Sequence, residues 1–105
     1  MKSYFGIVVA TVLATFPSTL ALGQVGADTY KAKCMMCHSA DGSGSSPAGK
    51  AMGAMPFNSP ALVKASDADL IAATKNGKGK MPAYTGKLTD AQIKDVVAYI
   101  RTLQK

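Results

Sequence analysis

The sequence predicts an all-α domain of three to four helices wrapped around one bound group. Apolar residues recur at helical spacing in the last third of the chain, two of these stretches follow helix-capping residues, and no stretch alternates as a half-buried strand would. A length of 105 residues allows a single domain. Large apolar side chains are few after residue 23 and Trp is absent, so a bound group has to complete the core.

The chemistry of that group is indicated by the stretch Cys34-Met35-Met36-Cys37-His38, which holds both cysteines and the one histidine of the chain. C-x-x-C-H is the attachment motif of a c-type haem. Two thiols about one helical turn apart can each add to a haem vinyl group, and the next side chain can ligate the iron. We therefore predict one covalent haem c, with Cys34 and Cys37 as attachment sites and His38 as an axial metal ligand.

Three other interpretations of the motif are weaker. A structural zinc site needs four ligands, and the adjacent Cys37 and His38 would chelate one metal poorly. A disulfide between Cys34 and Cys37 would close a very small loop, where the entropic gain is least. A thioredoxin-like redox dithiol needs a βαβ context, of which the sequence shows no sign; it remains the main alternative to haem attachment.

The first 23 residues have the features of a secretory signal peptide. Lys2 precedes an apolar run over residues 4–16, Pro17 breaks the run, and Ala21 and Gly23 are small residues of the kind a signal peptidase reads. We expect cleavage after Gly23, a domain over residues 24–105, export to the periplasm and no stable membrane insertion. The alternative is an uncleaved anchor, because residues 3–27 carry no charge; the short apolar core argues against a spanning helix.

The expected mature chain is basic. Eleven of the twelve Lys and Arg residues follow residue 23, against six Asp and no Glu. Nucleic acid is an improbable partner for an exported protein without aromatic residues interleaved in a basic stretch, so we expect a monomer that meets redox proteins with acidic docking surfaces. Four lysines near one loop are predicted to form a positive docking ring, unless they are only a solvated face: Lys75, Lys78, Lys80 and Lys87.

The first half of the domain is expected to form one helix and one loop. The helix should run from about Ala27 into the motif, with Gly26, Tyr30 and Cys34 on one face. The Gly- and Ser-rich stretch 39–55 reads as a loop along one haem edge. An axial histidine usually donates its second ring nitrogen to a carbonyl, and Pro47 could supply that carbonyl to His38, although an ordinary loop proline is equally compatible with the sequence.

The second half is expected to add an apolar patch and two helices. The patch, predicted to pack under the haem, consists of Phe57, Pro60, Leu62 and Val63. Ser66 is the expected N-cap of a helix that ends at a left-handed C-cap, Asn76-Gly77. Thr89 and Gln92 form a capping box for the last helix. The apolar stripe of that helix contains Ile93, Val96, Val97, Ile100 and Leu103.

The opposite side of the iron needs a second ligand, and methionine can supply it. Met81 follows glycines and precedes Pro82, which prevents a helix, so its thioether lies on a loop that can reach the open haem face. Met35 and Met36 lie between the attachment cysteines and cannot reach that face. The loop methionines Met52 and Met55 can reach it, and an open distal site is the remaining alternative.

These motifs resemble those of the class I monohaem cytochromes c, in particular the short bacterial and photosynthetic-type members, over essentially the whole of residues 24–105. Gly26, Tyr30 and Tyr99 are similar to that family's contact between its first and last helices. Residues 76–83 are similar to its axial-methionine loop, which implies that Met81 is the distal ligand. The resemblance implies the small class I cytochrome c fold, and we take Pro47 and Tyr84 as further haem-binding residues.

An iron held by His38 and Met81 has no open position for oxygen or peroxide. One-electron exchange is then the chemistry left, which predicts a soluble electron carrier and not an enzyme. Two alternatives stay open: a haem subunit tethered to a larger dehydrogenase or oxidase, and a small haem peroxidase or sensor with an open distal site.

Overall fold

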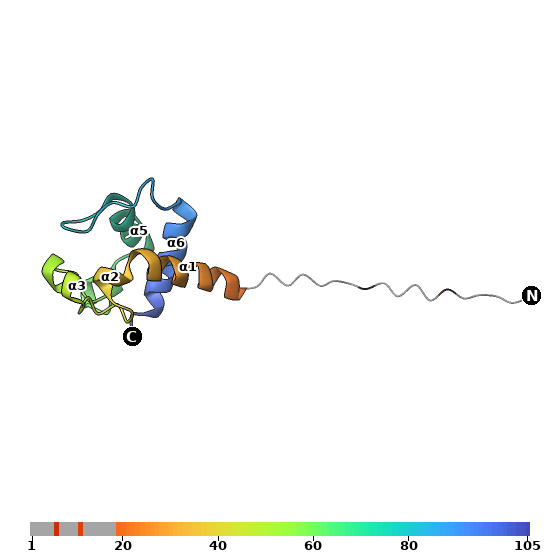
Figure 1. Cartoon of the computed structure of the whole chain (residues 1–105), viewed down its shortest axis with the longest axis horizontal. Coiled ribbons are helices and arrows are strands. Elements are labelled where there is room, and N and C mark those ends of the chain that lie inside the picture. Colours follow the sequence, from red (N-terminus) through yellow and green to blue (C-terminus); the bar gives the residue numbers. More distant parts are fainter. Residues whose placement is uncertain (1–5, 7–10, 12–18) are drawn as a thin grey trace, which may run out of the picture.

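A computed structural model describes residues 6, 11 and 19–105, and the regular secondary structure of this part consists of helices joined by loops (Figure 1). The helices of the described part are α1 (Thr19–Lys33), α2 (Met35–His38), α3 (Pro47–Met52), α4 (Pro60–Lys64), α5 (Asp67–Asn76) and α6 (Asp90–Thr102). Only two isolated β-bridges, and no strand, occur among these residues. The all-α prediction is confirmed, with three short helices, α2 to α4, in addition to the three long ones.

Helix α1 begins eight residues earlier than the expected start at Ala27. Leu and Ala at positions 20–22 are strong helix formers, which accounts for the extension across the boundary between residues 23 and 24. Most of the predicted signal peptide lies outside the described residues. Within residues 19–105, no helix is both long enough and apolar enough to cross a membrane.

Helices α1 and α6 pack against each other through the contact that the resemblance implied. The rings of Tyr30 and Tyr99 lie 5.2 Å apart between centroids, and Tyr30 is almost completely buried. A Cβ atom on Gly26 would lie 2.5 Å from the carbonyl oxygen of Asp95, so a side chain at position 26 would force the helices apart. Glycine is therefore required at this crossing.

Helix α6 supplies half of the buried apolar side chains among residues 19–105. Its N-terminus has the predicted capping box: Thr89 Oγ1 accepts from the Gln92 backbone N–H (3.1 Å), and Gln92 Oε1 accepts from the Thr89 N–H (2.8 Å). The apolar stripe faces inward as expected. Its buried members are Ile93, Val96, Val97 and Ile100, while Leu103 is half-buried.

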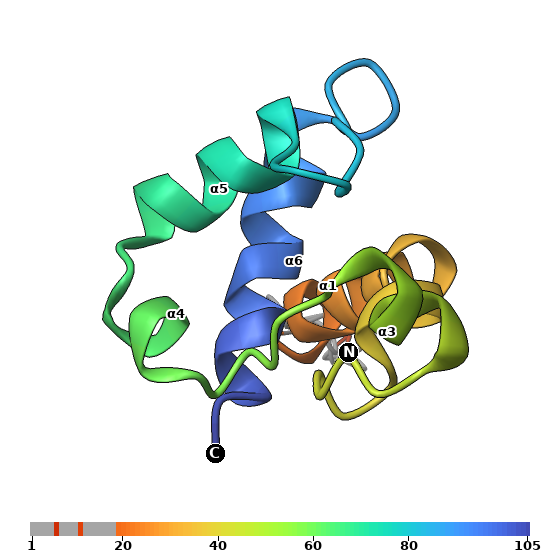
Figure 2. The same ribbon diagram turned by 90° about the vertical axis from the view of Figure 1, so that its left-hand side faces the viewer.

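Helix α5 has the predicted limits. Ser66 caps it by accepting from the Asp69 N–H (3.1 Å), and the helix ends at Asn76. Gly77 has a positive φ of 77°, but its ψ of 164° is extended, so the predicted left-handed C-cap is wrong in ψ. The backbone of Gly77 is extended because the chain passes directly from α5 into the loop over residues 78–81. Figure 2 shows α4 and α5 on one side of α6, with α3 on the other.

Candidate haem-binding site

The attachment motif continues from α1 into the short helix α2. Cys34 N–H donates to the Tyr30 carbonyl (2.8 Å) and His38 N–H donates to the Cys34 carbonyl (2.9 Å). This geometry sets Cys34 and Cys37 one helical turn apart, with His38 directly after them. Cys34 is buried, Cys37 is half-buried, and both are free thiols. Both sulfurs are therefore available to form thioether bonds.

Burial sets the protonation states in this motif. It raises the pKa of the Cys34 thiol to about 11, and the nearby Cys37 adds to the shift. It lowers the pKa of the His38 imidazole below its ordinary value. His38 is thus held in the neutral form, which is the form that ligates a metal.

The Gly- and Ser-rich stretch after the motif folds back onto it. Ser46 Oγ donates to the Met36 carbonyl (2.6 Å) and accepts from the Gly49 N–H (3.0 Å), which caps α3. Gly44 N–H donates to the His38 carbonyl (2.9 Å). A Cβ atom on Gly49 would lie 2.1 Å from the Cys37 carbonyl oxygen. Helix α3 therefore packs with its backbone directly on the attachment motif.

The predicted hydrogen bond between His38 and Pro47 is not made in this structure. His38 Nδ1 is buried and has no hydrogen-bond partner. Pro47 is the first residue of α3, and the carbonyls of a helix point along its axis toward the C-terminus. The Pro47 carbonyl is therefore directed into α3. Pro47 nevertheless lies beside the attachment motif, because the hydroxyl of the preceding residue, Ser46, donates to the Met36 carbonyl within that motif.

Phe57 has a role that the sequence did not reveal. Its ring stacks on the His38 imidazole, with centroids 4.6 Å apart and planes 25° apart, and its side chain is buried. The sequence placed Phe57 in an apolar patch under the haem. That patch is split in the structure, because Leu62 packs against the core whereas Pro60 and Val63 are exposed. A histidine and a phenylalanine 19 positions apart carry no local signal of contact.

The loop that carries Met81 is anchored at the motif. Lys78 and Met81 exchange two backbone hydrogen bonds, of 3.1 and 2.9 Å, in a tight turn. At the end of the loop, the Tyr84 hydroxyl donates to the carbonyl of Lys33, the residue before Cys34 (2.9 Å). Burial raises the pKa of Tyr84, and the charges of the two cysteines add to the shift.

The other candidate methionines differ from Met81 in exposure. Met81 is half-buried, whereas Met52 and Met55 are 53% and 49% exposed. Met55 lines a groove of about 510 Å³ beside α4 and α5, which extends to Gly77 and Lys78 at the start of the Met81 loop. Neither cysteine nor His38 lines this groove. The structure thus links the Met81 loop to the motif through Tyr84, and it places Met55 at the groove.

The donor set fits a haem. Two buried side-chain polar atoms in the described part of the chain lack hydrogen-bond partners, His38 Nδ1 and Ser59 Oγ. No three His, Cys or Asp side chains among residues 6, 11 and 19–105 are grouped to hold a metal ion by themselves. A porphyrin brings four nitrogen donors of its own, so two thiols and one neutral imidazole are the protein groups that it requires on this side.

An all-helical domain that carries this motif, with a tyrosine that ties a methionine-bearing loop to the residue before it, belongs to the class of c-type cytochromes. The family model described as cytochrome c oxidase, cbb3-type, subunit III matches residues 21–100. Cytochrome c6 of Leptolyngbya boryana is 36% identical over 78 residues, which cover 71% of this chain and 85% of that protein. The cbb3-type cytochrome c oxidase subunit CcoP of Azospirillum brasilense is 33% identical over 79% of this chain, but over only 29% of that protein.

Among solved structures, the KustC0563 c-type cytochrome superposes with a TM-score of 0.70 and 29% identity, covering 76% of this chain and 98% of its own. The chain therefore belongs to the cytochrome c family, as a small class I monohaem cytochrome c with one covalently bound haem c. Its function is electron transport. Haem c supplies reversible one-electron exchange at its iron when it is bound.

Proposed function

We propose that Cys34 and Cys37 hold the haem covalently and that His38 and Met81 ligate its iron from opposite faces. The observation that carries this proposal is the hydrogen bond from Tyr84 to Lys33, which ties the end of the Met81 loop to the residue before the first haem cysteine. The neutral, half-buried His38 and the half-buried Met81 support it. Tyr84 thus acts as an anchor at the haem edge, and Pro47 as the start of the helix that covers the motif.

With both axial positions taken by side chains of the protein, the site is a carrier site and not an enzyme site. Fixed ligands on both faces leave no position at which oxygen or peroxide could react, and they keep the geometry similar in the two oxidation states. A thioether ligand favours the reduced iron and raises the potential.

The basic surface near the loop suits an acidic redox partner. Lys78 and Lys80 are exposed, and Lys87 lies over the Tyr84 ring, 5.8 Å from its centroid. Lys75 differs, because its ammonium pairs with Asp90 (3.3 Å) at an exposed position. The docking ring that we propose therefore consists of Lys78, Lys80 and Lys87. It would steer association by long-range attraction and would lose strength as salt is added.

We further propose that the protein is exported to the periplasm as a monomer, after cleavage behind Gly23. The uncharged run from residue 3 to residue 27 and the small residues at 21 and 23 support it. The mass of the holo-protein purified from its native host tests this part. We expect a chain that begins at Gln24 and carries one haem, and a mass that retains residues 1–23 would contradict cleavage.

The axial ligation is tested by proton NMR of the reduced holo-protein. The methyl group of a ligating methionine sits over the porphyrin and shifts far upfield through the ring current. We expect this resonance in the wild type and in Met55→Ala, and its loss in Met81→Ala. If the resonance survives in Met81→Ala and is lost in Met55→Ala, Met55 is the ligand. If the wild type lacks it, the distal site is open.

A second candidate function is that of a haem subunit bound to a larger oxidase. It is favoured by the matching family model, described as an oxidase subunit, and by the likeness to CcoP. This candidate predicts that the holo-protein sediments with membranes and elutes with a large complex in size exclusion. The carrier candidate predicts that it stays in the soluble exported fraction and elutes at its own size. The two outcomes exclude each other for the bulk of the protein.

A further inference from the structure

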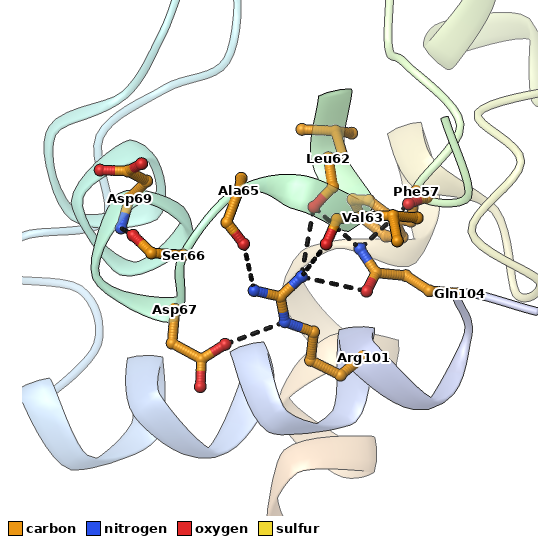
Figure 3. A network of polar contacts seen from close by, with 9 residues as sticks. All are labelled: Phe57, Leu62, Val63, Ala65, Ser66, Asp67, Asp69, Arg101 and Gln104. Carbon is orange, nitrogen blue, oxygen red and sulfur yellow. Dashed lines mark hydrogen bonds and ion pairs between the residues drawn. The ribbon is translucent and has the colours of Figure 1, made fainter. Parts of the chain in front are cut away.

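Arg101 of α6 binds the segment that connects α4 with α5. Its guanidinium donates to the backbone carbonyls of Leu62 (3.2 Å) and Ala65, with a longer contact to Val63 (3.5 Å), and it also pairs with the carboxylate of Asp67 (2.9 Å) (Figure 3). The Arg101 side chain is 27% exposed and that of Asp67 is 72% exposed. An ion pair that open to water contributes little, so the bonds to the carbonyls are the main restraint.

Gln104 extends this contact toward the site. Its Oε1 accepts from Arg101 Nη1 (3.1 Å), and its Nε2 donates to the carbonyls of Phe57 (3.0 Å) and Leu62 (3.3 Å). Figure 3 shows both side chains reaching toward the carbonyls of this segment, where they share the Leu62 carbonyl as an acceptor. Arg101 and Gln104 together therefore fix the backbone on both sides of α4, from Phe57 to Ala65. We call these two residues the α6 clamp.

Phe57 is the point at which the α6 clamp approaches the iron ligand. Its carbonyl is held by Gln104, and its ring stacks on the imidazole of His38, with centroids 4.6 Å apart. His38 Nδ1 has no hydrogen-bond partner, so no such bond fixes the rotation of the imidazole. In most haem proteins a hydrogen bond at that nitrogen orients the ring. Here the face of Phe57 is the observed contact that limits its rotation.

We infer that the α6 clamp is a positioning device for the axial imidazole: Arg101 and Gln104 hold Phe57, and Phe57 fixes the ring plane of His38. This inference rests on the proposed role of His38 as an iron ligand. It assigns to the end of α6 a part in setting the orientation of the ligand, and through it the reduction potential, in addition to its part in the core.

The test uses charge-conserving substitutions in the full holo-protein. Arg101→Lys keeps the positive charge but loses the planar fork that reaches several carbonyls, and Gln104→Ala removes the link to Phe57 without a change of charge. Phe57→Leu removes the stacked ring itself. The matched control is Asn58→Ala, which deletes an exposed contact of 3.5 Å between the same segment and the Lys105 carbonyl but touches neither clamp residue.

Two readouts separate positioning from mere stability: the haem methyl shifts of the oxidised protein and its reduction potential. A fixed imidazole plane makes the four methyl shifts unequal, and averaging over several orientations brings them together. We expect Arg101→Lys, Gln104→Ala and Phe57→Leu to narrow the spread of these shifts and to displace the potential, whereas Asn58→Ala matches the wild type.

A lowered melting temperature with an unchanged methyl pattern in Gln104→Ala would overturn the inference and leave the clamp a structural contact only. If Arg101→Lys does not yield holo-protein, Gln104→Ala, which keeps the guanidinium, decides the matter alone. A wild-type spectrum that lacks the signature of a histidine ligand would instead refute the proposed ligation, so the two failures are distinguishable.

Discussion

Gly49 lies where α3 meets the attachment motif, and its replacement by alanine gives the sharpest test of how the motif is held. The new Cβ would lie 2.1 Å from the Cys37 carbonyl oxygen and 2.5 Å from that of Gly44. Both neighbours are backbone atoms, so neither can rotate away. The contact with Cys37 has to lengthen by about 0.9 Å even to reach the shortest separation found in real proteins, which requires α3 to move.

The size of the effect follows from two opposed terms. Overpacking of this kind costs about 1 to 3 kcal/mol, and a collision with two backbone oxygens belongs at the upper end. Alanine is the better helix former by about 1 kcal/mol. We therefore expect Gly49→Ala to lower the free energy of unfolding by about 2 kcal/mol, which is about 8 to 16 °C in melting temperature for a domain of this size.

Thermal unfolding of the oxidised holo-protein, followed by circular dichroism at 222 nm, measures this change. Gly53→Ala is the matched control, because position 53 has a positive φ of 70° but no atom within 4 Å of a new Cβ. It should lose only the strain of that backbone conformation, about 1 kcal/mol. A Gly49→Ala protein as stable as the wild type, or more stable, would refute the direct packing of α3 on the motif.

The crossing of α1 and α6, the cap of α6 and the basic loop surface can each be tested by substitution. Gly26→Ala should destabilise the holo-protein by about 1 to 3 kcal/mol in chemical denaturation, because the new Cβ would lie 2.5 Å from the Asp95 carbonyl oxygen. An unchanged denaturation midpoint would contradict the close crossing of α1 and α6. Thr89→Ala should cost about 1 kcal/mol by removing the capping box, whereas Thr89→Ser should keep most of that stability. Replacing Lys78 and Lys80 together by Gln should slow electron transfer to an acidic redox protein at low salt and make the rate depend less on salt concentration. The same dependence of rate on salt in the variant and the wild type would contradict the docking role.

The helices with strong local signals were predictable from the sequence. Thr89 and Gln92 form the expected capping box, and Ser66 caps α5 as its position before two aspartates indicated. Helices α3 and α4 were not predicted as helices, and α2 was predicted only as the end of the first helix. They contain only four to six residues, which is too short for an apolar repeat to show, and they form because the chain packs around the motif.

The chemistry of the site was predictable where it is local in sequence. The two thiols and His38 lie within five positions, and the structure keeps them together. The contacts of His38 were not predictable in the same way. Phe57 reaches it from 19 positions away, and the Pro47 carbonyl is directed along α3, so a bond that the sequence made plausible is absent. Long-range contacts of this kind are set by packing, which leaves no local pattern.

The measurement that tests the account most directly is the addition of carbon monoxide to the reduced holo-protein at neutral pH. Carbon monoxide binds ferrous haem only where a position is open or its ligand is easily displaced. We expect an unchanged visible spectrum for the wild type and ready binding of carbon monoxide by Met81→Ala, which lacks the proposed distal ligand. Binding by the wild type as complete as that by Met81→Ala would contradict a closed site and, with it, the proposal of a dedicated electron carrier.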